Sequence, residues 1–195
     1  MLLGIREIDR VVYPDLPEHN RPPWGLSQRW IQREKDIYTI LVDGKDNVKG
    51  YLNAAPLVDS VFEQVKRDGI NNKDIDQEIE PFAPGKPLKL YFMSIGIAPD
   101  ARHPASMEEL VKGFFVKLSG YAKMNIRVSE FAAVVWTNEG KRLCKAVGMD
   151  EIAKYKDTDG ELHPVFWMSL NAKIAAGRRF IGYTKELVDL YKTMG

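Results

Sequence analysis

The chain has 195 residues, enough for one compact domain with its own core. Its 28 basic and 27 acidic side chains leave a net charge of +1, which excludes a general electrostatic attraction to nucleic acid or to anionic membranes. The single cysteine, Cys144, excludes an internal disulfide and a cysteine-rich metal site, and no apolar run approaches the roughly 20 residues of a membrane span.

The N-terminal part predicts a strand, a helix and a hairpin. Residues 2–8 favour a short strand, and the prolines that follow predict a loop, because proline lacks the amide donor that a helix needs. Residues 24–35 place apolar side chains on one helical face, which predicts a helix. Residues 37–42 are β-branched and aromatic, and a turn rich in Asp, Gly and Asn joins them to residues 48–54, so these two segments predict a β-hairpin.

The middle of the chain begins with residues 58–87, which predict an insertion that carries one or two helices. Its second half is acidic and contains Asp74, Asp76, Glu78 and Glu80. An apolar strand is predicted over residues 88–97, and after a loop we expect a helix with Ser106 as its N-cap. The C-terminal part predicts strands at 131–136, 151–156 and 163–170, a helix at 184–194, and a modest basic patch at 173–179 that includes Arg178 and Arg179.

A mixed sheet suits this order of elements, since a right-handed crossover sets the strand near Ile95 parallel to the strand near Ala133. The order of strand, loop, helix, strand and helix between Leu88 and Met149 resembles the acyl-coenzyme A binding half of the GCN5-related N-acetyltransferase (GNAT) family. The resemblance implies an α/β (α+β) fold whose twisted, mostly antiparallel sheet splays between its fourth and fifth strands and is flanked by helices. It also implies a single domain over residues 1–195, with the insertion at 58–87.

The resemblance implies that acetyl-coenzyme A (acetyl-CoA) is the cosubstrate and lies in the wedge between these two strands. Strand backbone would face the pantetheine arm, and the following loop would face the diphosphate. Arg102 occupies the first position of the family's diphosphate motif, although Ala105 stands where that motif has glycine. The alternative is an ordinary loop with a solvated arginine. The implied contacts are Ile95, Gly96, Ile97, Arg102, His103, Ala105 and Ser106.

A second family motif begins the helix after the fifth strand. Gly140 takes its small position, and Thr137 and Asn138 fall where asparagine is usual, so the resemblance implies that these three residues contact the cosubstrate. Cys144 takes the position of a tyrosine that often protonates the departing coenzyme thiolate. Because a thiol can donate a proton, Cys144 is either this acid or a small buried hydrophobic residue.

A carboxylate that could act as general base is missing from residues 88–97, where the family often has one. We assign Glu130 to this role, with Glu80 and Asp100 as substitutes, although each could be a solvated surface charge. The three histidines show no metal-ligand spacing, so no metal site is expected.

The leading function is direct transfer of an acetyl group from coenzyme A to an amine, without an acyl-enzyme. The alternative is a non-catalytic GNAT-like protein that binds coenzyme A, another ligand or a protein, and a nucleic-acid module is a third option that the near-neutral charge disfavours. The acceptor would be a small molecule or a protein, and the acidic insertion would steer a cationic amine. The sequence leaves open whether the chain forms a homodimer. No targeting segment precedes Arg6, so we expect a soluble cytoplasmic protein.

Overall fold

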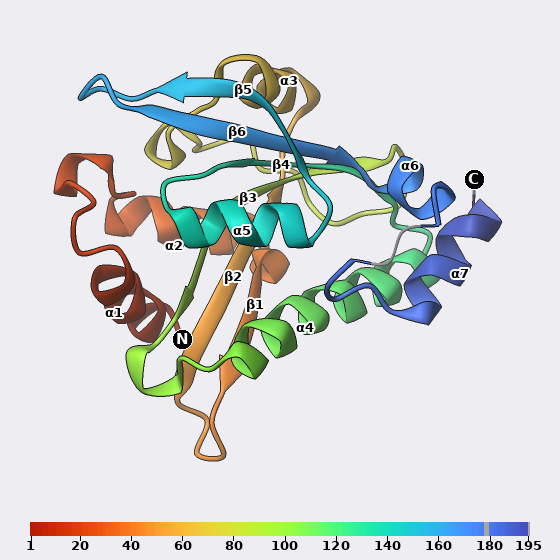
Figure 1. Ribbon diagram of the computed structural model, residues 1–195, viewed down its shortest axis with the longest axis horizontal. Coiled ribbons are helices and arrows are strands. Elements are labelled where there is room, and N and C mark those ends of the chain that lie inside the picture. The colour runs from red at the N-terminus through yellow and green to blue at the C-terminus, as the bar shows by residue number, and fades with distance from the viewer. Residues whose placement is uncertain (178–179, 195) are drawn as a thin grey trace.

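The computed structural model describes residues 1–177 and 180–194 (Figure 1), so Arg178 and Arg179 of the basic patch lie outside the described residues. The strands are β1 (Tyr38–Val42), β2 (Val48–Pro56), β3 (Leu88–Ile97), β4 (Val128–Val134), β5 (Asp150–Lys156) and β6 (Leu162–Ser169). The helices are α1 (Leu2–Val12), α2 (Trp24–Arg33), α3 (Asp59–Asp68), α4 (Pro104–Lys123), α5 (Asn138–Ala146), α6 (Leu170–Ala175) and α7 (Lys185–Met194). None of these helices is both long and apolar enough to cross a membrane.

The strands form one sheet in the order β1-β2-β3-β4-β6-β5. Neighbouring strands pair antiparallel except β3 and β4, which run parallel, so the mixed, mostly antiparallel sheet is confirmed. The β3–β4 pairing extends from Leu88 and Val128 to Phe92 and Ala133. Beyond this pair, β3 continues beside β2 and β4 continues to Val134 beside β6, so the sheet splays open between its third and fourth strands.

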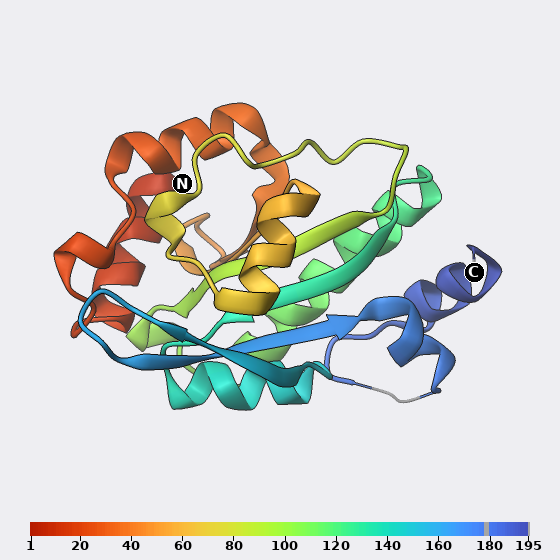
Figure 2. The ribbon, with the colours of Figure 1, turned by 90° about the horizontal axis from the view of Figure 1, so that it is seen from above.

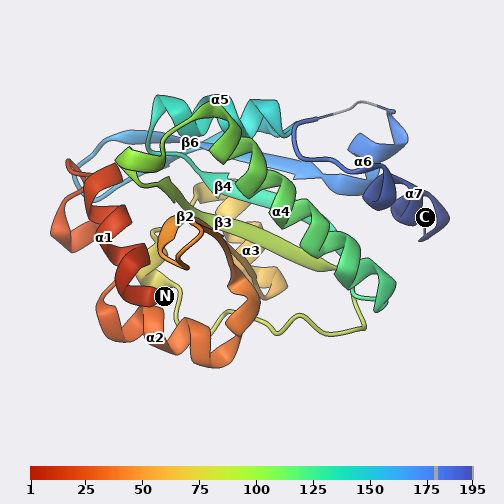
Figure 3. The same ribbon diagram turned by 90° about the horizontal axis from the view of Figure 1, so that it is seen from below.

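Helices cover both faces of the sheet. One core joins α4, α5 and α7 to one face, and a second joins α2 and α3 to the other. Figures 2 and 3 show this separation, with α1 and α2 on the side of the sheet away from α4. Phe114 and Leu118 of α4 are buried in the first of these cores, whereas Val116 of the same helix is 49% exposed. That the domain spans residues 1–195 stays a prediction.

The segment 2–8, predicted as a strand, belongs to α1. Its Ile5 and Ile8 are buried at helical spacing and pack against Tyr51 of β2. Gly96 of β3 leaves room for this contact, because a Cβ there would lie 3.1 Å from Ile8 Cγ2 and 3.0 Å from Tyr51 Cε1. The missing first strand explains why the splay lies between the third and fourth strands of this sheet rather than the fourth and fifth.

The insertion at 58–87 contains one helix, α3, followed by an irregular return. Gly69 ends α3 with φ of 71°, and a Cβ there would lie 2.3 Å from Tyr155 Cβ, so glycine is needed at this position. The acidic half forms a short 3-10 turn at Asn72–Asp74 and a bridge between Leu57 and Ile79 instead of a second helix. The segment that follows α3 thus lies beside the end of β2.

Candidate functional site

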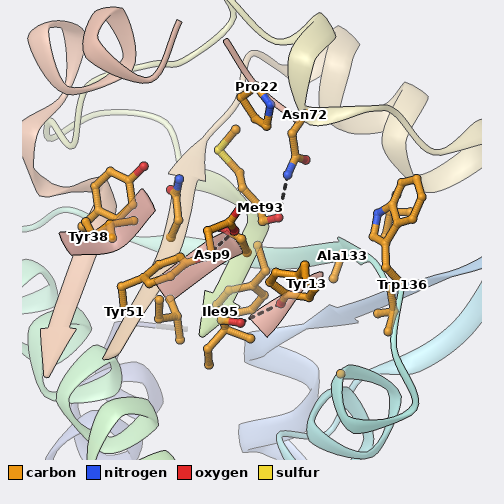
Figure 4. A pocket seen from close by; sticks show the side chains of 18 of the residues that line it. Asp9, Tyr13, Pro22, Tyr38, Tyr51, Asn72, Met93, Ile95, Ala133 and Trp136 are labelled. Carbon is orange, nitrogen blue, oxygen red and sulfur yellow. Dashed lines mark hydrogen bonds between the residues drawn. The ribbon is translucent and has the colours of Figure 1, made fainter. Parts of the chain in front are cut away.

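A cavity of about 180 Å³ lies at the splay and is lined from both faces of the sheet. On the α4/α5 side its walls are apolar and include Phe114, Leu143 and Val147. On the α1/α2 side its walls are polar and aromatic, as Figure 4 shows for part of the lining. The lining on this side includes Arg6, Asp9, Arg10, Tyr13, Asn20, Arg21, Trp24, Tyr38, Tyr51, Asn53, Asn71, Asn72 and Trp136.

The free edge of β3 carries backbone carbonyls that no strand pairs, and two side chains satisfy them. The Tyr13 hydroxyl donates to the Ile95 carbonyl at 2.6 Å, and Asn72 Nδ2 donates to the Met93 carbonyl at 2.7 Å (Figure 4). Buried backbone groups need such partners. Burial raises the pKa of Tyr13 to about 12, so its hydroxyl stays protonated at neutral pH. Both bonds occupy positions where a ligand could pair with the strand instead.

Asp9 lies on the polar side of the cavity and is held by two donors. The Tyr51 hydroxyl donates to Asp9 Oδ1 at 2.6 Å, and Arg21 Nη1 donates to Asp9 Oδ2 at 2.8 Å. Arg21 also donates to the Tyr13 carbonyl. Burial, and secondly the Asp9 charge, raises the pKa of Tyr51 well above its ordinary value. This network fixes the end of α1 against β2.

Four asparagines, Asn20, Asn53, Asn71 and Asn72, line the same side of the cavity. Asn20 and Asn53 are 4% and 1% exposed, and Asn71 Nδ2 donates to Asn20 Oδ1 at 3.0 Å. Among the described residues, Asn20 Nδ2 and Asn53 Oδ1 have no hydrogen-bond partner. A buried polar atom without a partner costs about 1–3 kcal/mol, so these two atoms are candidate contacts for a ligand.

The apolar side contains residues that the second sequence motif predicted. Thr137 caps α5 by accepting the Gly140 amide at 3.0 Å, and a Cβ at Gly140 would lie 3.0 Å from Val135 Cγ1. Cys144 is 8% exposed, and burial raises the pKa of its thiol to about 12. Thr137, Gly140 and Cys144 all line the cavity, as does Ile95.

The predicted diphosphate loop lies beside β3, outside the cavity lining. α4 begins at Pro104 with His103 as its N-cap, because His103 Nδ1 accepts the Ala105 amide at 3.2 Å. Ser106, which we expected as the cap, instead donates to the Ala101 carbonyl at 2.8 Å. Among the predicted cosubstrate contacts, those that do not line the cavity are Gly96, Ile97, Arg102, His103, Ala105, Ser106 and Asn138.

Glu130, which we assigned from the sequence as the general base, lies away from the splay. It pairs with Lys89 where β3 and β4 are still hydrogen-bonded, and it does not line the cavity. Trp167 Nε1 donates to Glu130 Oε2 at 2.6 Å, and Lys66 Nζ lies 3.2 Å from the same oxygen. Glu130 therefore holds a structural network and is not placed to act as a base.

The other acidic residues weighed from the sequence also lie elsewhere. Glu80 pairs with Lys86 at 3.0 Å, Asp100 pairs with Lys49, and Asp76 Oδ1 lies 2.8 Å from Arg29 Nε. None of the acidic residues of the insertion lines the cavity. The expected steering of a cationic amine by the insertion therefore has no support in the geometry.

The polar side was missed by sequence reasoning, because its residues come from segments far apart in the chain. Asn53 carries the clearest signal, since a polar side chain interrupts the apolar strand β2. Elsewhere, Asp157, Glu161 and His163 bring ligand atoms within 4.8 Å of one another. Asp157 Oδ1 accepts the amides of Asp159 and Glu161, so the turn itself accounts for that arrangement.

A scan against protein-family models and a search of the curated proteins give no significant match to this chain. Solved structures do match. The NatC complex bound to Gag peptide and CoA is similar with a TM-score of 0.52 and 11% identity, over 85% of this chain and 89% of that chain. Arabidopsis thaliana Naa50 in complex with the bisubstrate analogue CoA-Ac-MVNAL is similar with a TM-score of 0.51 and 13% identity, over 83% and 89%. These likenesses show that the chain has the fold of GNAT acetyltransferases.

Proposed function

On this GNAT fold, we propose that the protein transfers an acetyl group from acetyl-CoA directly to an amine. The observation that carries the proposal is the cavity at the splay, which reaches both faces of the sheet beside Ile95. A donor and an acceptor that approach from opposite faces would meet there, and holding them together supplies much of the rate of such a reaction.

Acetyl-CoA would lie on the α4/α5 side, along the free edge of β3. Its pantetheine amides would pair with Ile95 and Ile97 and displace the Tyr13 hydroxyl from the Ile95 carbonyl. The diphosphate would reach the exposed Arg102 and the N-terminal turn of α4, where amides and the helix dipole favour anions. The two similar structures support acetyl-CoA as the cosubstrate, since one is bound to CoA and the other to an analogue that contains CoA.

The amine would attack the thioester carbon from the α1/α2 side. A C–N bond forms, the C–S bond breaks, and the coenzyme leaves as a thiolate that accepts a hydrogen bond from the Cys144 thiol and takes its proton from the solvent. The amine loses a proton, for which we assign Asp9, the carboxylate that lines the cavity in the described part of the chain. Positioned proton transfer of this kind contributes about 10²–10⁴-fold to a rate.

A second candidate is a protein that binds coenzyme A without transfer. Two observations favour it: Cys144 replaces the family's tyrosine, and Tyr13 already occupies the Ile95 carbonyl. Both candidates predict binding, but only the first predicts turnover.

Thermal unfolding with acetyl-CoA and a thiol-release assay with a panel of amines separate these candidates. One-site binding at about 100 times the dissociation constant stabilises the fold by roughly 2.7 kcal/mol. Arg102→Ala should weaken binding, whereas Arg67→Ala, a control at an exposed arginine of α3 that pairs with Asp68, should not. Binding with turnover supports the transferase, and binding alone supports the second candidate. A melting temperature unmoved by millimolar acetyl-CoA would refute both.

A further inference from the structure

The charged side chains that line the cavity lie on one side of it. In the described part of the chain they are Arg6, Asp9, Arg10 and Arg21, all from α1 or the loop after it. Three of these side chains are cations and one is an anion. The acceptor side therefore carries an excess of positive charge, although the whole chain is nearly neutral.

Arg21 and Asp9 neutralise each other through their 2.8 Å contact. The positive charges of Arg6 and Arg10 are therefore the ones that this pair does not neutralise. Neither forms an ion pair with any carboxylate of residues 1–177 and 180–194. They stand four residues apart on α1, where like charges repel and destabilise a helix. The Arg6 guanidinium lies 5.4 Å from the centre of the Trp24 ring, which holds it at the cavity. An anion between the two arginines would relieve the repulsion.

Two asparagines that line the cavity place a second, independent requirement on the ligand. Asn53 Oδ1 is a buried acceptor that lacks a donor, and Asn20 Nδ2 is a buried donor that lacks an acceptor. Both residues line the same side of the cavity as the arginines. A ligand that satisfies them must offer both an N–H or O–H group and an oxygen.

We propose that the acceptor is a small amine that also carries a carboxylate or phosphate group, with the anionic group bound by Arg6 and Arg10. This inference rests on the proposed acetyl transfer and specifies its acceptor. The amine points toward Ile95 and the splay, and polar groups between its two ends contact Asn20 and Asn53. Guanidinium groups suit both anions, because their N–H donors match pairs of carboxylate or phosphate oxygens.

The test compares acceptors that differ only in the anionic group. Glycine is paired with glycinamide, phosphoethanolamine with ethanolamine, and putrescine serves as a cationic amine. Acceptor kcat/KM is measured by thiol release for the intact protein, Arg6→Gln, Arg10→Gln and the control Arg67→Gln. Since the two members of a pair differ in amine basicity, the informative quantity is how their ratio changes between variants.

We expect each cavity substitution to lower kcat/KM for the anionic member on the order of tenfold through KM, as the loss of a charge-assisted hydrogen bond implies. The neutral member, the KM of acetyl-CoA and the Arg67→Gln protein should be unaffected. Added salt should raise the KM of the anionic member alone. The anionic acceptor with the higher kcat/KM, glycine or phosphoethanolamine, shows whether a carboxylate or a phosphate is the preferred group.

Equal losses for both members of a pair, or preferred use of putrescine, would overturn the inference. So would a protein that binds acetyl-CoA but neither binds nor acetylates any anionic acceptor, and in that case the donor half of the proposed function survives. Absence of acetyl-CoA binding would remove the proposed function itself, and the inference with it.

Discussion

The Tyr13 hydroxyl donates a 2.6 Å hydrogen bond to the Ile95 carbonyl and thereby ties the end of α1 to the free edge of β3. The two residues are 82 positions apart in the chain, and their contact lies in the gap where β3 and β4 separate. A ligand that pairs with Ile95 must replace this bond. Tyr13 is therefore a competitor for the position that the proposed cosubstrate would occupy.

Tyr13→Phe should make acetyl-CoA bind more tightly and the free protein less stable. The substitution leaves the Ile95 carbonyl without its donor, which costs about 1–3 kcal/mol in the free state and lowers the melting temperature. Because the ligand no longer breaks a hydrogen bond worth about 0.5–1.5 kcal/mol, its dissociation constant should fall about threefold to tenfold. Calorimetric titration measures this, with Tyr38→Phe as a control from the same cavity wall. Weaker binding to Tyr13→Phe would show that Tyr13 contacts the ligand directly.

Cys144→Ala should lower kcat on the order of tenfold and leave the acetyl-CoA dissociation constant almost unchanged, because the thiol donates a hydrogen bond to the departing thiolate. With the pKa of Cys144 raised to about 12, the thiol is protonated at neutral pH and should react slowly with iodoacetamide. Bound acetyl-CoA should slow that reaction further. Full turnover by Cys144→Ala would mean that the thiol does not contact the departing thiolate and that the side chain only fills the core.

Asp9→Asn and Glu130→Gln should differ in their effects on turnover. Asp9 lines the cavity, so its loss should reduce kcat by about 10²-fold or more. Glu130 lies between Lys66 and Lys89, so its substitution should lower the melting temperature and spare kcat. The melting temperature of Asp9→Asn, measured beside its kcat, distinguishes a lost base from a disturbed fold. Normal turnover by Asp9→Asn would exclude it as the base.

Lys117 on α4 should make the free energy of unfolding depend on pH above neutrality. Its Nζ donates to the Asp36 and Tyr38 carbonyls at 2.7 and 3.2 Å, and burial lowers its pKa from 10.5 to about 8. Between these values the unfolded chain binds more protons than the folded one, so stability rises with pH, by at most about 1.4 kcal/mol per pH unit. Urea unfolding of the intact protein and Lys117→Met measures this difference. A constant difference from about pH 7 to pH 10 would mean that Lys117 keeps its charge in the fold.

Local patterns predicted much of the sheet. The hairpin of β1 and β2 follows from β-branched residues around a turn, and the parallel pairing of β3 and β4 follows from the handedness of crossovers. Residues 2–8 were assigned wrongly, because so short a mixture of apolar and charged residues fits a strand or a helix. The packing of Ile5 and Ile8 on Tyr51 decides between them, and the sequence does not reveal that contact.

The sequence predicted one side of the cavity but not the other, because local patterns reach only residues that are close together in the chain. Thr137, Gly140 and Cys144 share one helix start, so a single motif predicted their proximity. Asp9 and Asn53 come from a helix and a strand that meet only after folding, and no spacing rule joins them. Reading α1 as a strand also hid how close Arg6 and Arg10 lie, because residues four apart are separated by about 6 Å along a helix but by about 13 Å along a strand.

A cavity that reaches both faces of the sheet bears on the order of events in a catalytic cycle. Two ligands that arrive by separate routes do not block each other, so neither must bind first and either product could leave first. Initial rates measured against both substrates should then give intersecting reciprocal plots. The parallel plots of a ping-pong scheme would require a covalent acetylated protein. Saturation with one substrate should therefore leave the access of the other unobstructed.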